Sequence, residues 1–120
     1  MAKAKEDNRS ELEKFTNRLF KKTINRYPRN EEEEVFVNSV MEKGLEEAVR
    51  EFFLSERFET YSDKDFVTAL FKGIMDVTPD EERFAFWCHK MEIRSKTGVI
   101  NGFFLSDEWK GLCEKYGVSV

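Results

Sequence analysis

The tetrapeptide Phe52-Phe53-Leu54-Ser55 recurs as Phe103-Phe104-Leu105-Ser106, 51 positions further along a chain of 120 residues. The same gapless shift also pairs Phe15 with Phe66, Leu19 with Leu70, Phe20 with Phe71, Lys21 with Lys72 and Pro28 with Pro79. A repeat of this length is typical of one supersecondary unit that is used twice and buries its apolar face against its neighbour. We therefore predict two tandem helical repeats, residues 11–61 and 62–120, after a frayed N-terminal segment at residues 1–10.

Each unit is predicted to hold three helices and a short closing helix. The first helices are expected at about residues 11–25 and 63–75, where apolar residues recur at three- and four-residue spacing. Ser10 and Ser62 are expected to cap these two helices, and Ser106 to cap the closing helix of the second unit. The stretch from Thr78 through Pro79 is expected to open the second helix of the second unit, as Pro28 and Asn30 do in the first. No segment alternates with a period of two, so the fold class is all-α, with both units packed into one compact helical domain.

Composition excludes several partners. The net charge is −4 and neither unit is basic, so no clustered Lys and Arg side chains are available to neutralise nucleic-acid phosphates. A basic stripe on the first helix (Lys14, Arg18, Lys21, Lys22) is interpreted as a solvated face in preference to an anion-binding site. No segment has the roughly 20 apolar residues that a bilayer span needs, so membrane insertion is not expected. Residues 1–10 also lack the apolar centre of a signal peptide.

The chain offers few groups for catalysis. His89 is the only histidine, and its neighbour Cys88 would point about 100° away from it on a helix, so no metal site or other cofactor is expected. Cys88 and Cys113 are interpreted as small buried hydrophobic residues, with a disulfide between them as the alternative. A Cys113–His89 nucleophile pair stays open as a remote alternative, because such pairs meet in space and not in sequence. We expect a protein that is not an enzyme.

Aromatic side chains are the better functional candidates. The sequence has more large rings than one buried stripe per helix requires, so either the two units share a core or some rings are exposed. A shared core is the favoured interpretation. Exposed rings would favour binding to a protein or to a sugar face, and the candidates for that role are Trp87, Trp109, Phe58 and Phe36.

The motifs resemble a known family. They comprise an aromatic helix of the form Phe-x-x-x-Leu-Phe, a Pro-Asp loop, an aromatic residue near Trp87 and the segment Gly-Phe-Phe-Leu-Ser-Asp-Glu-Trp at residues 102–109. This pattern resembles the bacterial family named domain of unknown function 4214, here as two copies over about residues 12–118. It is also distantly similar to the linker domains of phycobilisomes.

The resemblance implies a function without catalysis. Family members are commonly parts of extracellular or surface-associated proteins, which would place this chain outside the cell, with the cytoplasm as the alternative. The expected function is a non-catalytic interaction module that binds a protein partner or another part of its own polypeptide. A carbohydrate-binding module that uses exposed aromatic rings is the alternative, and a small Cys-dependent enzyme is the remote one.

Overall fold

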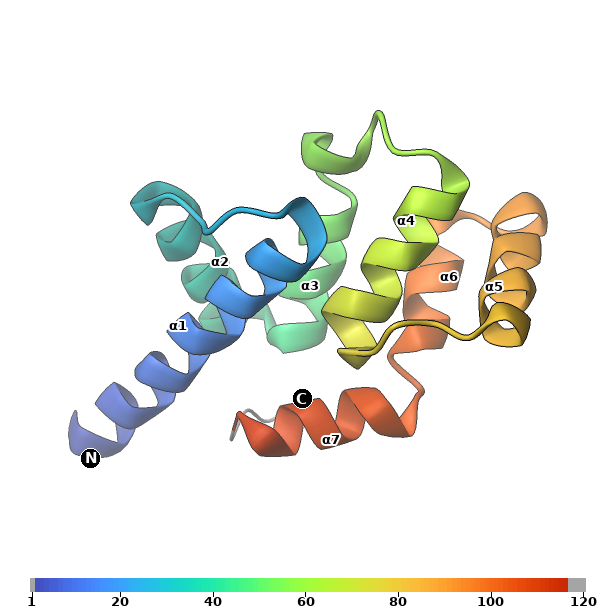
Figure 1. Ribbon diagram of the computed structural model, residues 1–120. Coiled ribbons are helices and arrows are strands. Elements are labelled where there is room, and N and C mark those ends of the chain that lie inside the picture. Colours follow the sequence, from blue (N-terminus) through green and yellow to red (C-terminus); the bar gives the residue numbers. More distant parts are fainter. Residues whose placement is uncertain (1, 117–120) are drawn as a thin grey trace.

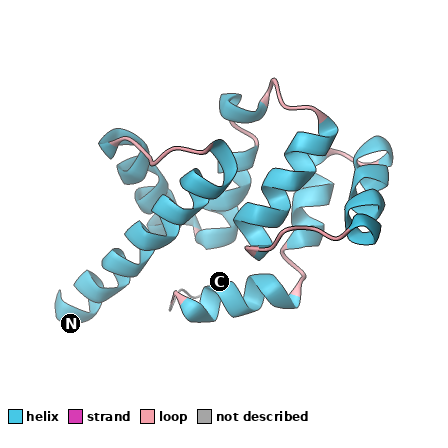
Figure 2. Ribbon diagram, viewed as in Figure 1, coloured by secondary structure: helices cyan, strands magenta, loops and turns pink. Residues whose placement is uncertain are grey.

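The computed structural model describes residues 2–116, and it describes side chains from Ser10 onward. Helices and short connections make up all of this part of the chain, which contains no strand (Figure 2). This confirms the all-α fold class. Figure 1 shows α3 and α6 in the middle of the molecule, with α2 beyond α3 and α5 beyond α6.

The helices follow one another in the order that the repeat predicts. Residues of the first unit form α1 (Ala2–Ile24), α2 (Asn30–Lys43), α3 (Leu45–Phe53) and the 3-10 turn η1 (Glu56–Phe58). Residues of the second unit form α4 (Asp63–Leu70), the π-helical turn η2 (Phe71–Met75), α5 (Glu81–Ile93), α6 (Lys96–Phe103) and α7 (Asp107–Lys115).

The starts of these elements obey the sequence shift. Three elements of the second unit, α5, α6 and α7, begin 51 residues after α2, α3 and η1. The first helix of each unit also ends in the same way, because Asn25 and Asp76, again 51 residues apart, both have a left-handed φ of 59°. Asn and Asp tolerate this conformation better than other residues with a Cβ, and it is a common way to end a helix.

The predicted start of the first helix was wrong. α1 begins at Ala2, so residues 2–10 continue the helix that was expected to start near residue 11. These residues include Ala, Lys and Glu, which favour helix, and no Gly or Pro interrupts them. Ser10 therefore lies inside α1 and does not cap its N-terminus.

Side-chain caps open four helices of the second unit. The hydroxyl of Ser62 accepts from the Asp65 amide at 3.1 Å, and the hydroxyl of Ser106 accepts from the Trp109 amide at 3.2 Å, as the sequence predicts for these two serines. Ser95 caps α6 in the same way. Asp80, and not Thr78, caps α5, so Pro79 precedes this helix instead of occupying its first turn.

Arg18 joins the two units. Its guanidinium donates to the carbonyls of Lys72 and Gly73, at 3.1 and 2.6 Å, and to a carboxylate oxygen of Asp76 at 3.3 Å. These carbonyls belong to the π-helical turn η2, and a helix end leaves carbonyls without partners within the helix. The interpretation of Arg18 as part of a solvated basic face was therefore wrong. Burial lowers the pKa of Arg18, and Asp76 opposes that effect.

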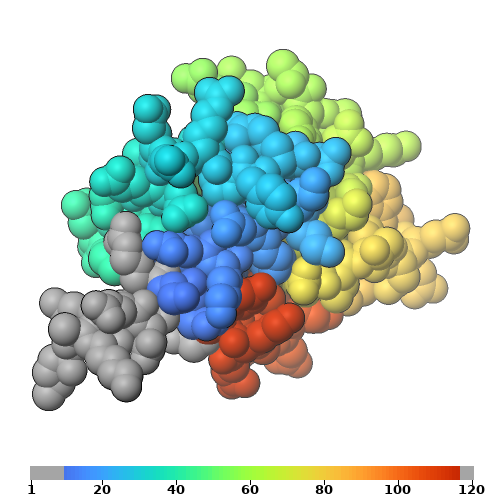
Figure 3. All heavy atoms as spheres, turned by 60° about the vertical axis from the view of Figure 1, so that its left-hand side comes forward, coloured from blue at the N-terminus to red at the C-terminus, as the bar shows by residue number. Residues whose placement is uncertain are grey.

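One core serves both units. α1 packs on α2, α4 and η2, while α3 packs on α6 and α7 packs on η2. On the face shown in Figure 3, α1 (blue) lies beside α7 (red), and Phe15 of α1 contacts Trp109 of α7 with ring centroids 6.2 Å apart. The aromatic side chains that are almost completely buried are Phe15, Phe20, Phe53, Phe58, Phe66, Phe71, Phe103 and Trp109.

Candidate functional site

Three of the four candidate interaction residues lie in this core. Trp109 and Phe58 are completely buried and Phe36 is nearly so, which means that they are not available to a partner or a sugar on the surface of this fold. Their rings instead pack on other rings, as in the contact of Phe36 with Phe15 at 6.3 Å between centroids. The large excess of aromatic residues is therefore explained mainly by a core shared between the units.

Trp87 is the exception. It is half-buried on α5, its indole packs on Phe103 with ring centroids 4.6 Å apart, and the ring of Phe86 stands nearly perpendicular to it with centroids 5.2 Å apart. It also lies directly over Gly102 of α6, where an added Cβ would be 2.6 Å from indole carbon Cη2. Because Trp87 packs closely on α6, it lies at the edge of the core and only part of its indole is accessible to solvent.

The two thiols and the imidazole differ in exposure and in their partners. Cys88 and Cys113 are free thiols, so no disulfide joins them. Cys113 is buried, and burial raises its pKa to about 11, with a smaller contribution from Glu46, which disfavours the reactive thiolate. His89 is exposed on α5, where its Nδ1 lies 3.6 Å from the carboxylate of Glu92 on the same helix. The described residues contain no group of three or more potential metal ligands.

Exposed apolar side chains recur at equivalent positions of the two units. Leu54 and Leu105, from the repeated tetrapeptide, are 45% and 79% exposed. Val35 of α2 and Phe86 of α5, also 51 residues apart, are both exposed. Single exposed apolar residues are common in proteins, but a matched pair at two equivalent positions is unusual enough to be informative. These exposed residues were not predicted, although the repeated Leu is visible in the sequence, because the tetrapeptide was interpreted only as structural.

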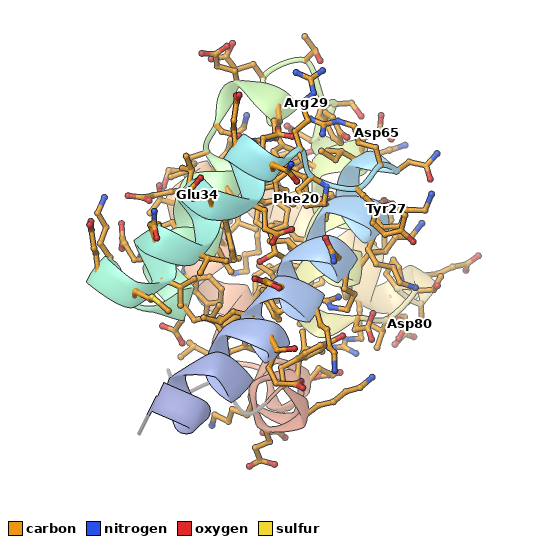
Figure 4. The ribbon with its side chains drawn as sticks, turned by 90° about the vertical axis from the view of Figure 1, so that its left-hand side faces the viewer. Phe20, Tyr27, Arg29, Glu34, Asp65 and Asp80 are labelled. Atoms are coloured by element: carbon orange, nitrogen blue, oxygen red, sulfur yellow. The ribbon has the colours of Figure 1, made fainter. Side chains whose placement is uncertain are left out.

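An aromatic pocket of about 210 Å³ opens between α2 and α3. Its apolar floor consists of Phe20, Phe36, Ala48 and Phe52. Phe20 projects from α1 towards α2, as Figure 4 shows, and its ring lies 4.8 Å from that of Phe52. The rim is mostly polar, and its residues are Glu32, Val35, Ser39, Glu51, Ser55 and Arg57.

The charged side chains at the rim all form ion pairs, with one another or with neighbouring residues. Glu32 accepts from Arg26 at 2.7 and 2.9 Å and from Arg57 at 2.8 Å. These hydrogen bonds, led by those from Arg26, hold the pKa of Glu32 far below its usual range. Arg57 also lies over the ring of Phe20 at 5.1 Å. On the opposite side of the pocket, Glu51 accepts from Lys43 at 2.7 Å, which lowers the pKa of Glu51. The rim is therefore polar but close to neutral.

A second hollow, of about 470 Å³, is basic. Lys21 and Lys22 from the end of α1 line it together with Lys72 from η2, and so do the two residues with left-handed backbone, Asn25 and Asp76. The C-terminal ends of helices carry partial negative charge, which lysine side chains stabilise. The charges of the hollow are therefore accounted for by the helix ends that they flank.

No helix among residues 2–116 combines the length and the apolar character that crossing a bilayer would require.

The comparisons with known proteins give one family. The model of the family described as "Domain of unknown function (DUF4214)" matches residues 49–113, which is more than half of the chain and runs from α3 to α7. No curated protein and no solved structure shows significant similarity to the chain. The chain thus belongs to the DUF4214 family.

Proposed function

We propose that the chain is a non-catalytic helical interaction module that mediates protein–protein assembly as part of a bacterial surface-associated or secreted protein. In this proposal the two units are two copies of one module. Membership of a family without an assigned reaction supports it, as do the buried thiol of Cys113 and the exposed, separately paired His89. A cytoplasmic location is the alternative setting.

The observation that carries the proposal is the matched exposure of Leu54 and Leu105. In both units the residue follows two buried phenylalanines and precedes a serine whose hydroxyl donates to the first phenylalanine carbonyl, at 2.7 Å in one unit and 2.8 Å in the other. The same serine hydrogen bond thus closes the turn in both units, and in both the leucine before that serine is exposed to solvent. An apolar side chain held in this way favours contact with another protein.

The test compares two double variants of the intact chain. Leu54→Ser with Leu105→Ser removes the matched pair, whereas Met41→Ser with Ile93→Ser removes two other exposed apolar residues that have glutamates at the equivalent positions. Each protein is used to capture partners from envelope and secreted fractions of the producing bacterium, and the affinity of each captured protein is then measured with purified components.

We expect a captured protein that binds the first double variant at least about tenfold more weakly than the unchanged chain, since two buried leucine contacts would be lost. The second double variant should bind it normally. The proposal is wrong if every captured protein binds the two double variants equally well. Equal helicity and equal unfolding midpoints of the two variants would show that the difference does not come from misfolding.

A further inference from the structure

The aromatic pocket of the first unit has a filled counterpart in the second. Two floor rings recur at the same spacing: the centroids of Phe20 and Phe52 are 4.8 Å apart and those of their equivalents, Phe71 and Phe103, are 4.9 Å apart, with interplanar angles of 54° and 83°. The third ring of the floor, Phe36, differs more from its equivalent. Trp87 packs on Phe103 at 4.6 Å, whereas the equivalent Phe36 stands at 85° to Phe52 with its centroid 6.4 Å away.

Two further substitutions between the units also favour a filled site in the second unit and an open one in the first. Val35 of the first unit is replaced by Phe86, whose ring stands at 89° to the indole of Trp87 with centroids 5.2 Å apart. Glu51 is replaced by Gly102, which leaves room for the indole to descend onto α6. The second unit therefore covers this floor with its own indole, while the first unit, with its smaller rings, leaves about 210 Å³ open.

The size of the open space limits the occupant. A buried apolar cavity of about 150 Å³ is known to hold benzene, whereas pockets for drug-sized ligands span about 300–1,000 Å³. A space of about 210 Å³ thus suits one aromatic ring system. The open mouth lets such a ring enter from outside, and Arg57, already over the rings of Phe20 and Phe52, supplies a cationic wall beside it.

The geometry points to this pocket as the acceptor for a single aromatic side chain of a partner protein, with tryptophan preferred. The inserted indole would lie on Phe52 as Trp87 lies on Phe103. Glu51 at the rim provides an acceptor for an indole N–H, because each of its carboxylate oxygens accepts only one hydrogen bond, from Ser39 and from Lys43. The same pairing occurs within the chain, where Trp109 Nε1 donates to Glu46 at 3.2 Å. This inference rests on the proposed assembly function and names the chemistry of the partner.

The test uses a tryptophan surrogate and a variant that copies the filled unit. N-acetyl-tryptophanamide is titrated into the ¹⁵N-labelled intact chain, and amide shifts are followed by NMR. We expect shifts centred on Ser39, Ala48 and Phe52, with a dissociation constant of about 1 mM or tighter. N-acetyl-alaninamide, which has the same backbone without the ring, should leave these amides unchanged.

The pocket-filled variant combines Val35→Phe, Phe36→Trp and Glu51→Gly, each taken from the equivalent position of the second unit. It should bind the surrogate at least about tenfold more weakly than the unchanged chain. If this variant does not fold, Ser39→Phe at the half-buried rim obstructs the mouth without changing the floor and serves the same purpose. Unchanged binding by the folded variant, or shifts centred elsewhere, would overturn the inference.

The outcome is separable from that of the proposed function. The variant Leu54→Ser with Leu105→Ser leaves every lining residue in place and should bind N-acetyl-tryptophanamide normally. Surrogate binding without any leucine-dependent partner would contradict assembly through the leucines and leave the pocket standing. A leucine-dependent partner without surrogate binding would contradict the pocket alone.

Discussion

The contact between Gly102 and Trp87 allows a quantitative prediction. A Cβ added at residue 102 would lie 2.6 Å from Cη2 and 2.9 Å from Cζ3 of the indole. Carbon atoms in contact normally stand about 3.5–4.0 Å apart, so the indole would have to move outward by about 1 Å. Overpacking of this kind costs about 1–3 kcal/mol, and the better helix propensity of alanine returns up to about 1 kcal/mol.

We therefore expect Gly102→Ala to lower the free energy of unfolding by about 1–2 kcal/mol and the Tm by about 4–8 °C. Urea denaturation followed by circular dichroism measures the first quantity, and a thermal scan measures the second. Gly111→Ala is the matched control, because no atom lies within 4 Å of a Cβ at that position in α7. The control should be neutral or more stable by up to about 1 kcal/mol.

The explanation is tested most directly by adding Trp87→Phe. This substitution removes the two indole atoms that the new Cβ would meet. The double variant should lose less stability than the sum of the single variants, with a coupling energy of about 1 kcal/mol. Additive losses, or a Gly102→Ala protein as stable as the unchanged one, would refute the reasoning.

Three other predictions concern charged and reactive groups. Arg18→Ala should lower the free energy of unfolding by about 2–3 kcal/mol in urea denaturation, because two carbonyls and Asp76 lose their donor; an effect below about 0.5 kcal/mol would contradict the bridging role. Glu32→Gln should reduce stability at pH 7 by about 1–2 kcal/mol and should flatten its dependence on acid. Because the folded-state pKa of Glu32 is depressed, its contribution is present above the unfolded pKa of about 4.3 and is lost as pH falls, so an unchanged acid profile would contradict this assignment. Cys113, with its pKa near 11, should react with iodoacetamide at pH 8 about a hundredfold more slowly than a small thiol, measured by peptide mass spectrometry, and equal rates would show that it is not buried.

The fold was largely predictable from the sequence because most helices are indicated twice, once in each of the two matching segments. The positions of Pro28 and Pro79 located the starts of α2 and α5 to within two residues. The caps at Ser62 and Ser106 also followed from local chemistry. The start of α1 did not, because a serine at residue 10 with Glu13 three positions later looks like a capping box even within a continuous helix.

The candidate site was much less predictable, because exposure depends on packing between units. Trp109 and Phe58 belong to the same core as Phe15 and Phe53, and nothing in the spacing of the rings tells which of them face outward. The pocket between α2 and α3 arises from a difference in ring size at matched positions. The sequence shows this difference in ring size, but only the structure shows that the larger ring, Trp87, fills its site by packing on Gly102.

Charged pairs show why a comparison of the two units by sequence alone misses shared contacts. Glu32 pairs with Arg57 at 2.8 Å, and the equivalent residues, Arg83 and Glu108, pair at 2.9 Å with the charges exchanged. When the units are aligned position by position, each of these two positions shows a reversal of charge, which looks unfavourable when it is considered alone.

In space, the exchange keeps the same ion pair between the second helix of each unit and its closing segment. Arg26, which also binds Glu32, has the uncharged Val77 at its equivalent position, so no extra cation faces Arg83 from that position. The two ion pairs therefore join equivalent segments in both units although the charges are exchanged, so the contact depends on opposite charge and not on which position carries it.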